Sequence, residues 1–138
     1  MENIERSVDI KASAATVWDI ISEPGWWVNK GEELRPHRLE PTGDGAVLVH
    51  DDEVGTFEIE VVRQDEPSYA AYRWRPTSPD DPATLTEFWV EPHEGGVTLR
   101  VVESDFAALP ADKLADFLHE NSHGWEQELG LAKARAES

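Results

Sequence analysis

The sequence contains no cysteine among its 138 residues. Without cysteine the chain cannot form a disulfide, use a thiol as a catalytic nucleophile or bind a metal through thiolate ligands. Because disulfides persist mainly in oxidising compartments, their exclusion fits a reducing one. We therefore expect a cytoplasmic protein that contains no cysteine-ligated metal.

Basic residues are scarce. Twelve Lys and Arg face 29 Asp and Glu, which gives a formal net charge of −17. A surface of this charge repels phosphate backbones and anionic membranes, so we expect no nucleic-acid partner. We interpret the charge mainly as a solubilising surface, and the alternative is that it helps to select a basic partner protein.

Long apolar runs are also missing. No uninterrupted run approaches the roughly 20 residues of a membrane-spanning helix, so we expect no membrane insertion. Residues 1–7 lack the basic and apolar parts of a signal peptide. The length, the 39% hydrophobic content and the six tryptophans instead predict one globular domain over residues 1–138, with no internal repeat or linker.

The N-terminal region predicts a strand followed by a short helix. Apolar and polar residues alternate over residues 4–10, the period of a half-buried strand. Ser13 is a suitable N-cap for an amphipathic helix over residues 14–21, and Pro24-Gly25 ends it. Residues 26–28 then form a loop or a second short helical turn.

The central region, from Pro36 to Phe106, contains only strand and turn patterns. Glu94-Gly95-Gly96 separates two longer alternating segments and predicts a hairpin, and Pro76–Pro82 predicts a stiff exposed loop. Consecutive strands with short turns favour an antiparallel sheet. The expected strands are His37–Glu40, Ala46–His50, Phe57–Val61, Tyr72–Trp74, Thr84–Glu91 and Val97–Glu103.

The C-terminal region, Leu109–Ser138, predicts one long helix, with Pro110 in its first turn. At 100° per residue a single stripe runs along it and suits it to cover the apolar face of the sheet. Gly124 lies at the margin of this stripe, where we expect it to let the helix approach the sheet closely. The stripe consists of Leu114, Phe117, Leu118, Asn121, Trp125, Leu129 and Ala132.

The same helix carries His119-Glu120-Asn121-Ser122-His123, which matches the H-E-x-x-H signature of zinc proteases. The two histidines lie at about 140° and 180° from Leu114, on the face opposite the apolar stripe. No third histidine follows them, and catalytic zinc needs a third protein ligand. We therefore predict a solvent-exposed histidine pair, and neither a metal site nor a cofactor.

Three segments resemble a known family in their order and spacing. VDIKASAATVW at residues 8–18 is similar to the family's first strand and helix, EPHEGGVTLRVVESDF at 91–106 to its last hairpin, and Gly124-Trp125 with Leu129 to its closing helix. Together they resemble the START/SRPBCC helix-grip superfamily, in the branch related to activators of the heat-shock-protein-90 ATPase. The resemblance covers nearly the whole chain.

This resemblance implies an α+β helix-grip fold: a curved antiparallel sheet of about six to seven strands wrapped round a long C-terminal helix, with one or two short helices after the first strand. It also implies a deep, largely apolar cavity, which relatives use for lipids, sterols, polyketides or hormones. Relatives often have Gly in place of Asp105 and Thr in place of Val97. These departures argue against transferring any particular ligand to this chain.

Glu103 is the most informative candidate residue. It continues the register of Val97, Leu99 and Val101, so its side chain should point to the apolar side of the sheet. A lone carboxylate there costs several kcal/mol unless it is paired or its pKa rises. It is therefore either a polar anchor in the cavity, or a residue at a solvated strand end or satisfied by an arginine.

Aromatic residues form the rest of the candidate site, although such rings commonly only fill a core. We expect Trp18 and Trp125 to be core residues. Asn121, inside the helix stripe, either bonds to a neighbouring strand or faces a ligand. The predicted ligand-binding set is Trp27, Phe57, Tyr72, Trp74, Phe88, Glu103, Phe117 and Asn121.

The other polar candidates are expected at the surface. Arg73 and Arg75 alternate with inward-facing aromatic residues, so solvent should surround them. His37, His50 and His93 lie in or beside turns. No Ser-His-Asp order, phosphate-binding glycine loop or paired carboxylates stand out.

Three functions remain open on the sequence. The leading one is non-catalytic binding of a small hydrophobic or aromatic molecule between sheet and helix. The second is a protein-interaction module like the chaperone-ATPase activators, for which the acidic surface would matter more than a cavity. The third is a cyclase- or hydrolase-like enzyme with Glu103 and Tyr72 as acid–base groups. A cavity of about 300 Å³ or more separates the first from the second.

Overall fold

Seven antiparallel strands form one sheet, in the order β1-β7-β6-β5-β4-β3-β2. The computed structural model describes residues 3–29, 34, 36–53, 55–75, 83–106 and 110–138, apart from the side chains of Ala111 and Phe117. The described strands are β1 (Ile4–Ile10), β2 (Arg38–Pro41), β3 (Ala46–Asp51), β4 (Gly55–Asp65), β5 (Tyr69–Arg75), β6 (Leu85–His93) and β7 (Gly96–Ser104).

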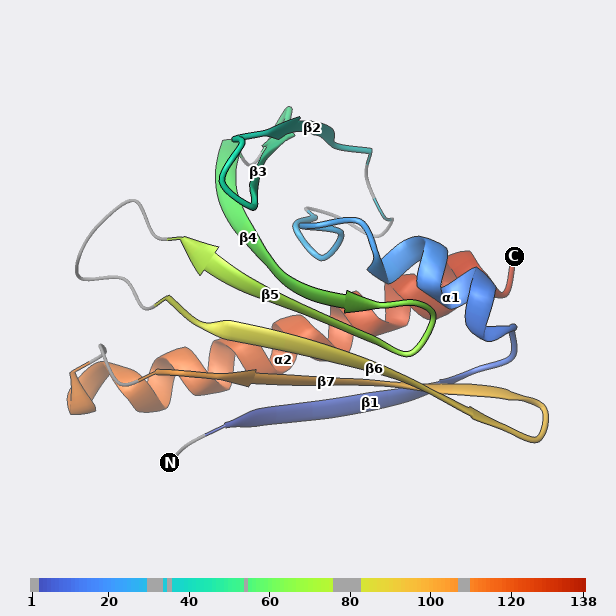
Figure 1. Ribbon diagram of the computed structural model, residues 1–138. Coiled ribbons are helices and arrows are strands. Elements are labelled where there is room, and N and C mark those ends of the chain that lie inside the picture. Colours follow the sequence, from blue (N-terminus) through green and yellow to red (C-terminus); the bar gives the residue numbers. More distant parts are fainter. Residues whose placement is uncertain (1–2, 30–33, 35, 54, 76–82, 107–109) are drawn as a thin grey trace.

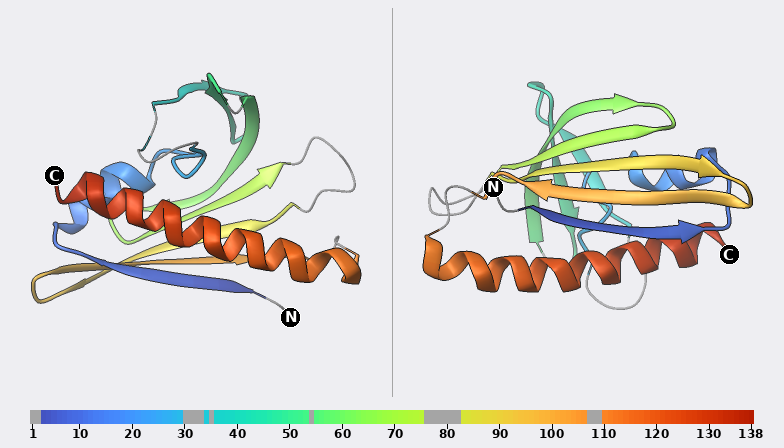
Figure 2. Two further views of the ribbon diagram at one scale, coloured as in Figure 1. Left: turned by 180° about the vertical axis from the view of Figure 1, so that it is seen from behind. Right: turned by 90° about the horizontal axis from the view of Figure 1, so that it is seen from below.

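The sheet curves strongly, and its β2–β4 end arches away from the plane of β1, β6 and β7 (Figure 1). Seen from behind and from below, one long helix runs along the inside of this curve (Figure 2). Strands consecutive in sequence are neighbours from β2 to β7, and β1 joins the sheet beside β7. The predicted helix-grip fold is confirmed.

Helix α1 (Ala14–Ile21) forms at the predicted residues. The Ser13 hydroxyl accepts a hydrogen bond from the Thr16 backbone N–H and so caps the first turn. Gly25 follows with φ +79°, and a Cβ there would stand 2.9 Å from the Val49 side chain. Glycine is therefore required both by the turn and by the close approach of β3.

Helix α2 (Ala111–Ala136) is two residues shorter at each end than predicted, and it packs against β1 and α1. Pro110 is its N-cap residue rather than a first-turn residue. The predicted stripe is confirmed for Trp125, Leu129 and Ala132, which are all buried. The expected close approach at Gly124 is wrong, because a Cβ added there would meet nothing within 4 Å.

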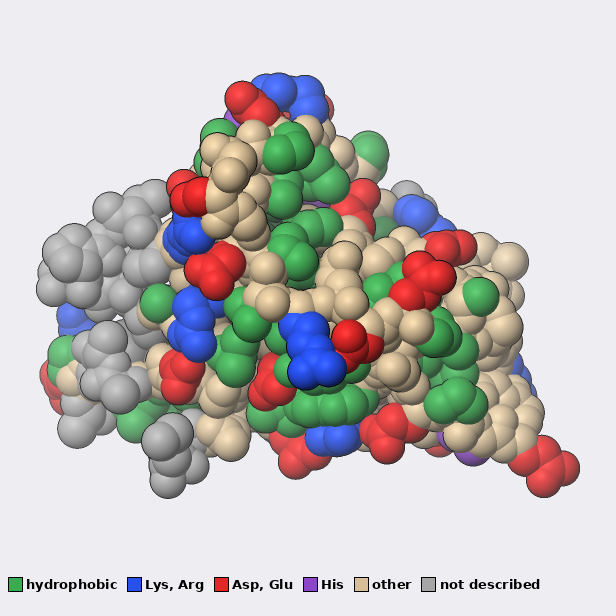
Figure 3. All heavy atoms as spheres, viewed as in Figure 1, with side chains coloured by type: hydrophobic (Ala, Val, Ile, Leu, Met, Phe, Trp, Pro, Cys, Tyr) green, Lys and Arg blue, Asp and Glu red, His purple; other side chains and the backbone are tan. Residues whose placement is uncertain are grey.

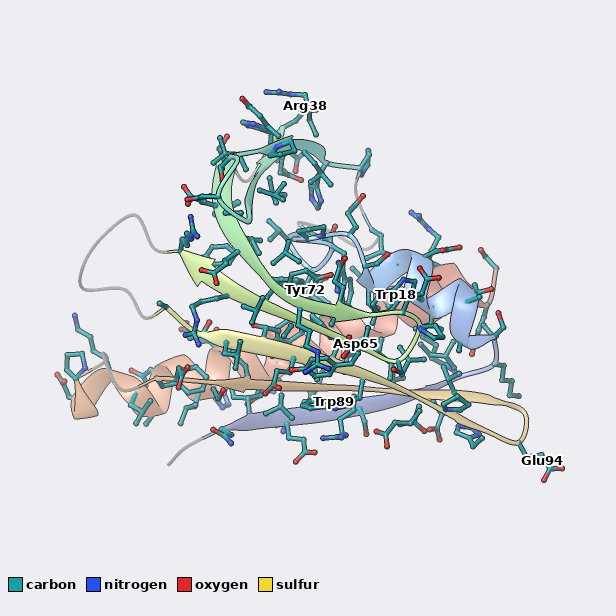
Figure 4. The ribbon with its side chains drawn as sticks, viewed as in Figure 1. Trp18, Arg38, Asp65, Tyr72, Trp89 and Glu94 are labelled. Atoms are coloured by element: carbon teal, nitrogen blue, oxygen red, sulfur yellow. The ribbon has the colours of Figure 1, made fainter. Side chains whose placement is uncertain are left out.

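The hydrophobic core lies where α1 and the C-terminal half of α2 cover the sheet. The β6–β7 hairpin passes the end of β1, and a Cβ on Gly96 would lie 2.1 Å from the Ile10 carbonyl oxygen. Glycine is needed at this point because two backbones meet there. Glu94 marks the tip of the hairpin and Arg38 the far edge strand (Figure 4).

One histidine lies elsewhere than the sequence predicts. His37 is not at the surface, because its side chain is fully buried. Its Nε2 lies 2.7 Å from the Val28 carbonyl oxygen and 3.2 Å from an Asp51 carboxylate oxygen. The turn brings it under the β2–β3 end of the sheet, which no local pattern revealed. Asp105 has φ +69°, a conformation that favours glycine.

The outer face of the sheet is charged. Acidic and basic side chains lie beside one another over the strands (Figure 3). Arg75 is half-buried rather than freely solvated, and it bonds to Asp44, Glu58 and Glu60, which raises its pKa. None of the helices in the described part of the chain is long and apolar enough to cross a membrane. The predicted loop Pro76–Pro82 lies outside the described residues.

Candidate functional site

The inward-facing residues of β6 and β7 change from apolar to polar along the strands. At the end near α1 they are Val90 and Leu99, and towards the other end they become Thr86 and Glu103. Thr86 and Glu103 are direct cross-strand partners, so their side chains are neighbours on the same face. The concave face is therefore closed by apolar packing at the end near α1, and it carries polar side chains at the other end.

A cavity of about 410 Å³ lies at this polar end, between the sheet and α2. Helix α2 contributes residues at positions 120, 121, 124, 125 and 128, which share one helical face. The volume of the cavity is within the range of small-molecule sites and above the roughly 300 Å³ that separates a binding protein from one with a filled core. The lining residues are Trp27, Trp74, Thr84, Thr86, Glu103, Glu120, Asn121, Gly124, Trp125 and Glu128.

Glu103 is held in the cavity wall by two donors. Trp125 Nε1 donates to its Oε1 over 2.9 Å, and Asn121 Nδ2 donates to the same oxygen over 3.1 Å. The residue is only 6% exposed, so the prediction that it points inward is confirmed. Among the described residues no donor reaches its second oxygen, which leaves an acceptor for a ligand.

Glu128 is a second buried carboxyl group in the same wall, one helical turn beyond Gly124. It is 9% exposed, and Asn29 Nδ2 donates to its Oε2 over 3.0 Å. Burial raises the pKa of Glu128 to about 7, and the Asn29 hydrogen bond offsets only part of that rise. Within the described part of the chain, its other oxygen also has no hydrogen-bond donor.

Three tryptophan rings supply most of the apolar lining. Trp27 lies in an aromatic cluster, with its ring centroid 5.5 Å from Tyr72, 5.6 Å from Phe88 and 5.9 Å from Trp125. Trp74, which also lines the cavity, packs against Phe57, with the two ring centroids 5.0 Å apart. Such contacts hold the rings in fixed orientations, so the cavity is largely preformed.

The predicted ligand-binding residues divide into three groups. Trp27, Trp74, Glu103 and Asn121 meet at the cavity. Phe57, Tyr72 and Phe88 lie outside its lining: Phe57 supports Trp74, and the other two are fully buried in the core. The side chain of Phe117 is outside the described residues.

Sequence reasoning missed six lining residues: Thr84, Thr86, Glu120, Gly124, Trp125 and Glu128. Thr84 and Thr86 could have been found, because they alternate in register with the inward-facing Phe88. Trp125, expected in the core only, is buried and yet also lines the cavity. Glu128 gave no signal, because a Glu among many on an acidic helix looks like a surface residue.

Tyr72 is unavailable as an acid–base partner of Glu103. Its hydroxyl donates to the Ile21 carbonyl oxygen over 2.7 Å and accepts from Gln64 Nε2 over 2.9 Å. Burial raises its pKa, and the side chain is fully enclosed. Figure 4 shows Tyr72 on β5 in the part of the molecule near α1. Its role is to tie the end of α1 to the sheet.

The histidine pair on α2 lies on the outer face, as the helical phase predicts. Both residues are exposed, and their ring centroids are 4.6 Å apart. His123 Nδ1 lies 3.6 Å from Glu126 Oε2. In the part of the chain that the structure describes, no group of three or more His, Asp or Glu residues is placed to hold a metal ion.

Comparison with known proteins places this geometry in a family. The model of the family described as polyketide cyclase / dehydrase and lipid transport matches residues 1–137. No curated protein matches the chain by sequence. Among solved structures, 203 chains match by fold, so the fold alone does not assign a function.

Three of these structures illustrate the range. The Aha1 dimer from Colwellia psychrerythraea is 17% identical, with a TM-score of 0.75 over 99% of this chain and 97% of that chain. The di-domain ARO/CYC BexL from the BE-7585A biosynthetic pathway is 16% identical, with a TM-score of 0.68 over 99% of this chain and 50% of that chain. DynU16 from the dynemicin biosynthetic locus is 18% identical, with a TM-score of 0.74 over 100% of this chain and 48% of that chain.

Proposed function

We propose that the cavity of this chain binds a small hydrophobic or aromatic molecule. The chain belongs to the polyketide cyclase / dehydrase and lipid transport family, which supports this proposal. The observation that carries the proposal is the preformed cavity of about 410 Å³ with three tryptophan rings in its wall. Flat apolar rings favour flat apolar ligands, and a few polar groups fix their orientation. Thr84, Thr86 and Asn121 are polar lining residues that are suited to orient the ligand.

Two glycines of α2 allow a matched test. At both Gly124 and Gly130 a Cβ meets nothing within 4 Å, but only Gly124 lines the cavity. Leucine at position 124 therefore fills the cavity, whereas leucine at position 130 adds the same side chain elsewhere on the helix. Both substitutions favour helix formation by about 0.5–1 kcal/mol, so neither should unfold the protein.

The probe is N-phenyl-1-naphthylamine, a neutral aromatic molecule whose fluorescence rises in apolar surroundings. We expect saturable binding to the wild-type chain and to Gly130→Leu, and at least tenfold weaker binding to Gly124→Leu. Native mass spectrometry of the purified chain would reveal a co-purified small molecule. Equal binding by all three chains would show that the probe adheres elsewhere and would contradict the proposal.

A second candidate function is acid–base catalysis within the same cavity, and Glu128 is the observation that favours it. A carboxyl group with a pKa of about 7 exchanges protons efficiently near neutral pH. We expect an enzyme of this kind to accelerate deuterium exchange into 1-phenylpropan-2-one, measured by NMR, and Glu128→Gln to abolish the acceleration. Exchange at the buffer rate with the wild-type chain would remove this candidate.

A further inference from the structure

The charge of the cavity wall is one-sided. Of its ten lining residues three are glutamates, and none of the ten is Lys, Arg or His. Two of these glutamates, Glu103 and Glu128, are more than nine-tenths buried. Both groups line the same cavity and are shielded from most of the surrounding solvent, where charge interactions are stronger than in bulk water. An anionic ligand would add to the repulsion between the two carboxylates.

The two buried carboxyl groups also keep unused acceptors. Glu103 accepts both of its hydrogen bonds through Oε1, and Glu128 accepts its single bond through Oε2. Within the described residues, the remaining oxygen of each group has no donor. A neutral hydrocarbon would leave these oxygens without water or a partner, which costs free energy, whereas a ligand with N–H donors would satisfy them.

The rings of the wall have the same electrostatic preference. The face of an indole ring carries negative potential and attracts cations, and tryptophan does so more strongly than tyrosine or phenylalanine. Trp27, Trp74 and Trp125 all line the cavity. A cation that reaches the face of one of these rings would therefore be attracted by the ring as well as by the carboxylates. The net charge of −17 also attracts cations towards the molecule.

We infer that the ligand of this cavity is an organic ammonium ion: a protonated amine attached to an aromatic or apolar group. Its N–H groups would donate to the free oxygens of Glu103 and Glu128, and its apolar part would lie against the tryptophan rings. This inference rests on the proposed function and narrows its ligand class. It separates this chain from a carrier of neutral or acidic lipids.

Three soluble probes of nearly equal size but different charge test the inference: 2-phenylethylammonium, 2-phenylethanol and 3-phenylpropanoate. Binding is measured at pH 8 by NMR titration of the indole N–H signals of Trp27, Trp74 and Trp125. We expect the ammonium ion to bind at least tenfold more tightly than the alcohol, and the carboxylate to bind most weakly.

Substitutions locate the charge preference. Glu103→Gln retains a carbonyl oxygen that accepts from Trp125 and Asn121, and Glu128→Gln retains one for Asn29. We expect either substitution to weaken ammonium binding by about tenfold while changing alcohol binding less than twofold. The control is Glu126→Gln, which removes the same charge from the same helix outside the cavity and should leave all three affinities unchanged.

The outcomes separate this inference from the function on which it rests. Equal affinities for the three probes, or tightest binding of the carboxylate, overturn the ammonium ligand and leave the binding cavity intact. An ammonium preference that Glu126→Gln reduces as much as Glu128→Gln does reflects the overall charge and also overturns it. Failure of all three probes, together with N-phenyl-1-naphthylamine, contradicts the cavity proposal itself.

Discussion

Replacing Glu128 by glutamine removes a buried carboxyl group and should make the protein more stable at alkaline pH. Burial raises the pKa of this group from an unfolded value of 4.5 to about 7. The folded state therefore binds the proton more tightly than the unfolded state does. In the wild-type chain, stability falls as the pH rises from about 4.5 to about 7 and the group ionises, and it changes little from this cause outside that range.

The size of the effect follows from the same difference. A pKa difference of about 2.5 corresponds to about 3.4 kcal/mol, and solvent that enters the cavity reduces this figure. We expect Glu128→Gln to match the wild-type free energy of unfolding near pH 4.5 and to exceed it by about 1–2 kcal/mol at pH 8. Glutamine keeps an acceptor for Asn29, so the packing changes little.

The measurement is urea unfolding of both chains at intervals between pH 4.5 and pH 8. A gain of this size corresponds to a rise of the midpoint by roughly 1 M urea. Glu126→Gln removes an exposed carboxylate paired with Arg6, and it should leave the shape of the pH profile unchanged. Parallel profiles for Glu128→Gln and the wild type would refute the reasoning, as would a Glu128 carboxyl that titrates near pH 4.5 by NMR.

Three further predictions concern the framework. Gly96→Ala should lower the free energy of unfolding by about 3 kcal/mol or more, since its Cβ would overlap the Ile10 carbonyl oxygen. Gly95→Ala, which is strained only by φ +93°, should lower it by about 1 kcal/mol. Similar urea midpoints for the two variants would contradict this difference. Tyr72→Phe should lose about 1–2 kcal/mol in thermal unfolding, because it removes one buried and one partly buried hydrogen bond, and an unchanged Tm would count against that role. The double substitution His119→Ala and His123→Ala should change the free energy of unfolding by less than about 0.5 kcal/mol, because both side chains are exposed. A large loss of stability measured by calorimetry, or tight zinc binding by the wild-type chain that the double substitution abolishes, would support a metal site.

Much of the fold was predictable because its signals are local. Alternation predicted β1 and the strands from β2 to β7, and Ser13 with the 3.6-residue spacing after it predicted α1. Helical phase alone separated the exposed His119 and His123 from the buried face of Trp125 and Leu129. Register likewise predicted that Glu103 points inward. Each inference needed only the geometry of one element.

The cavity and its membership depended on tertiary structure, because they arise where distant elements meet. Glu128 resembles any surface glutamate of an acidic helix until the Trp26–Asn29 turn covers it. Tyr72 and Phe88 follow the same inward alternation as Trp74 and Thr86, yet the curvature of the sheet and the position of α1 bury the first pair and leave the second beside the cavity. Sequence determined which side of each strand and helix faces inward; only the packing of α2 across the curved sheet decided which inward residues remain beside open space.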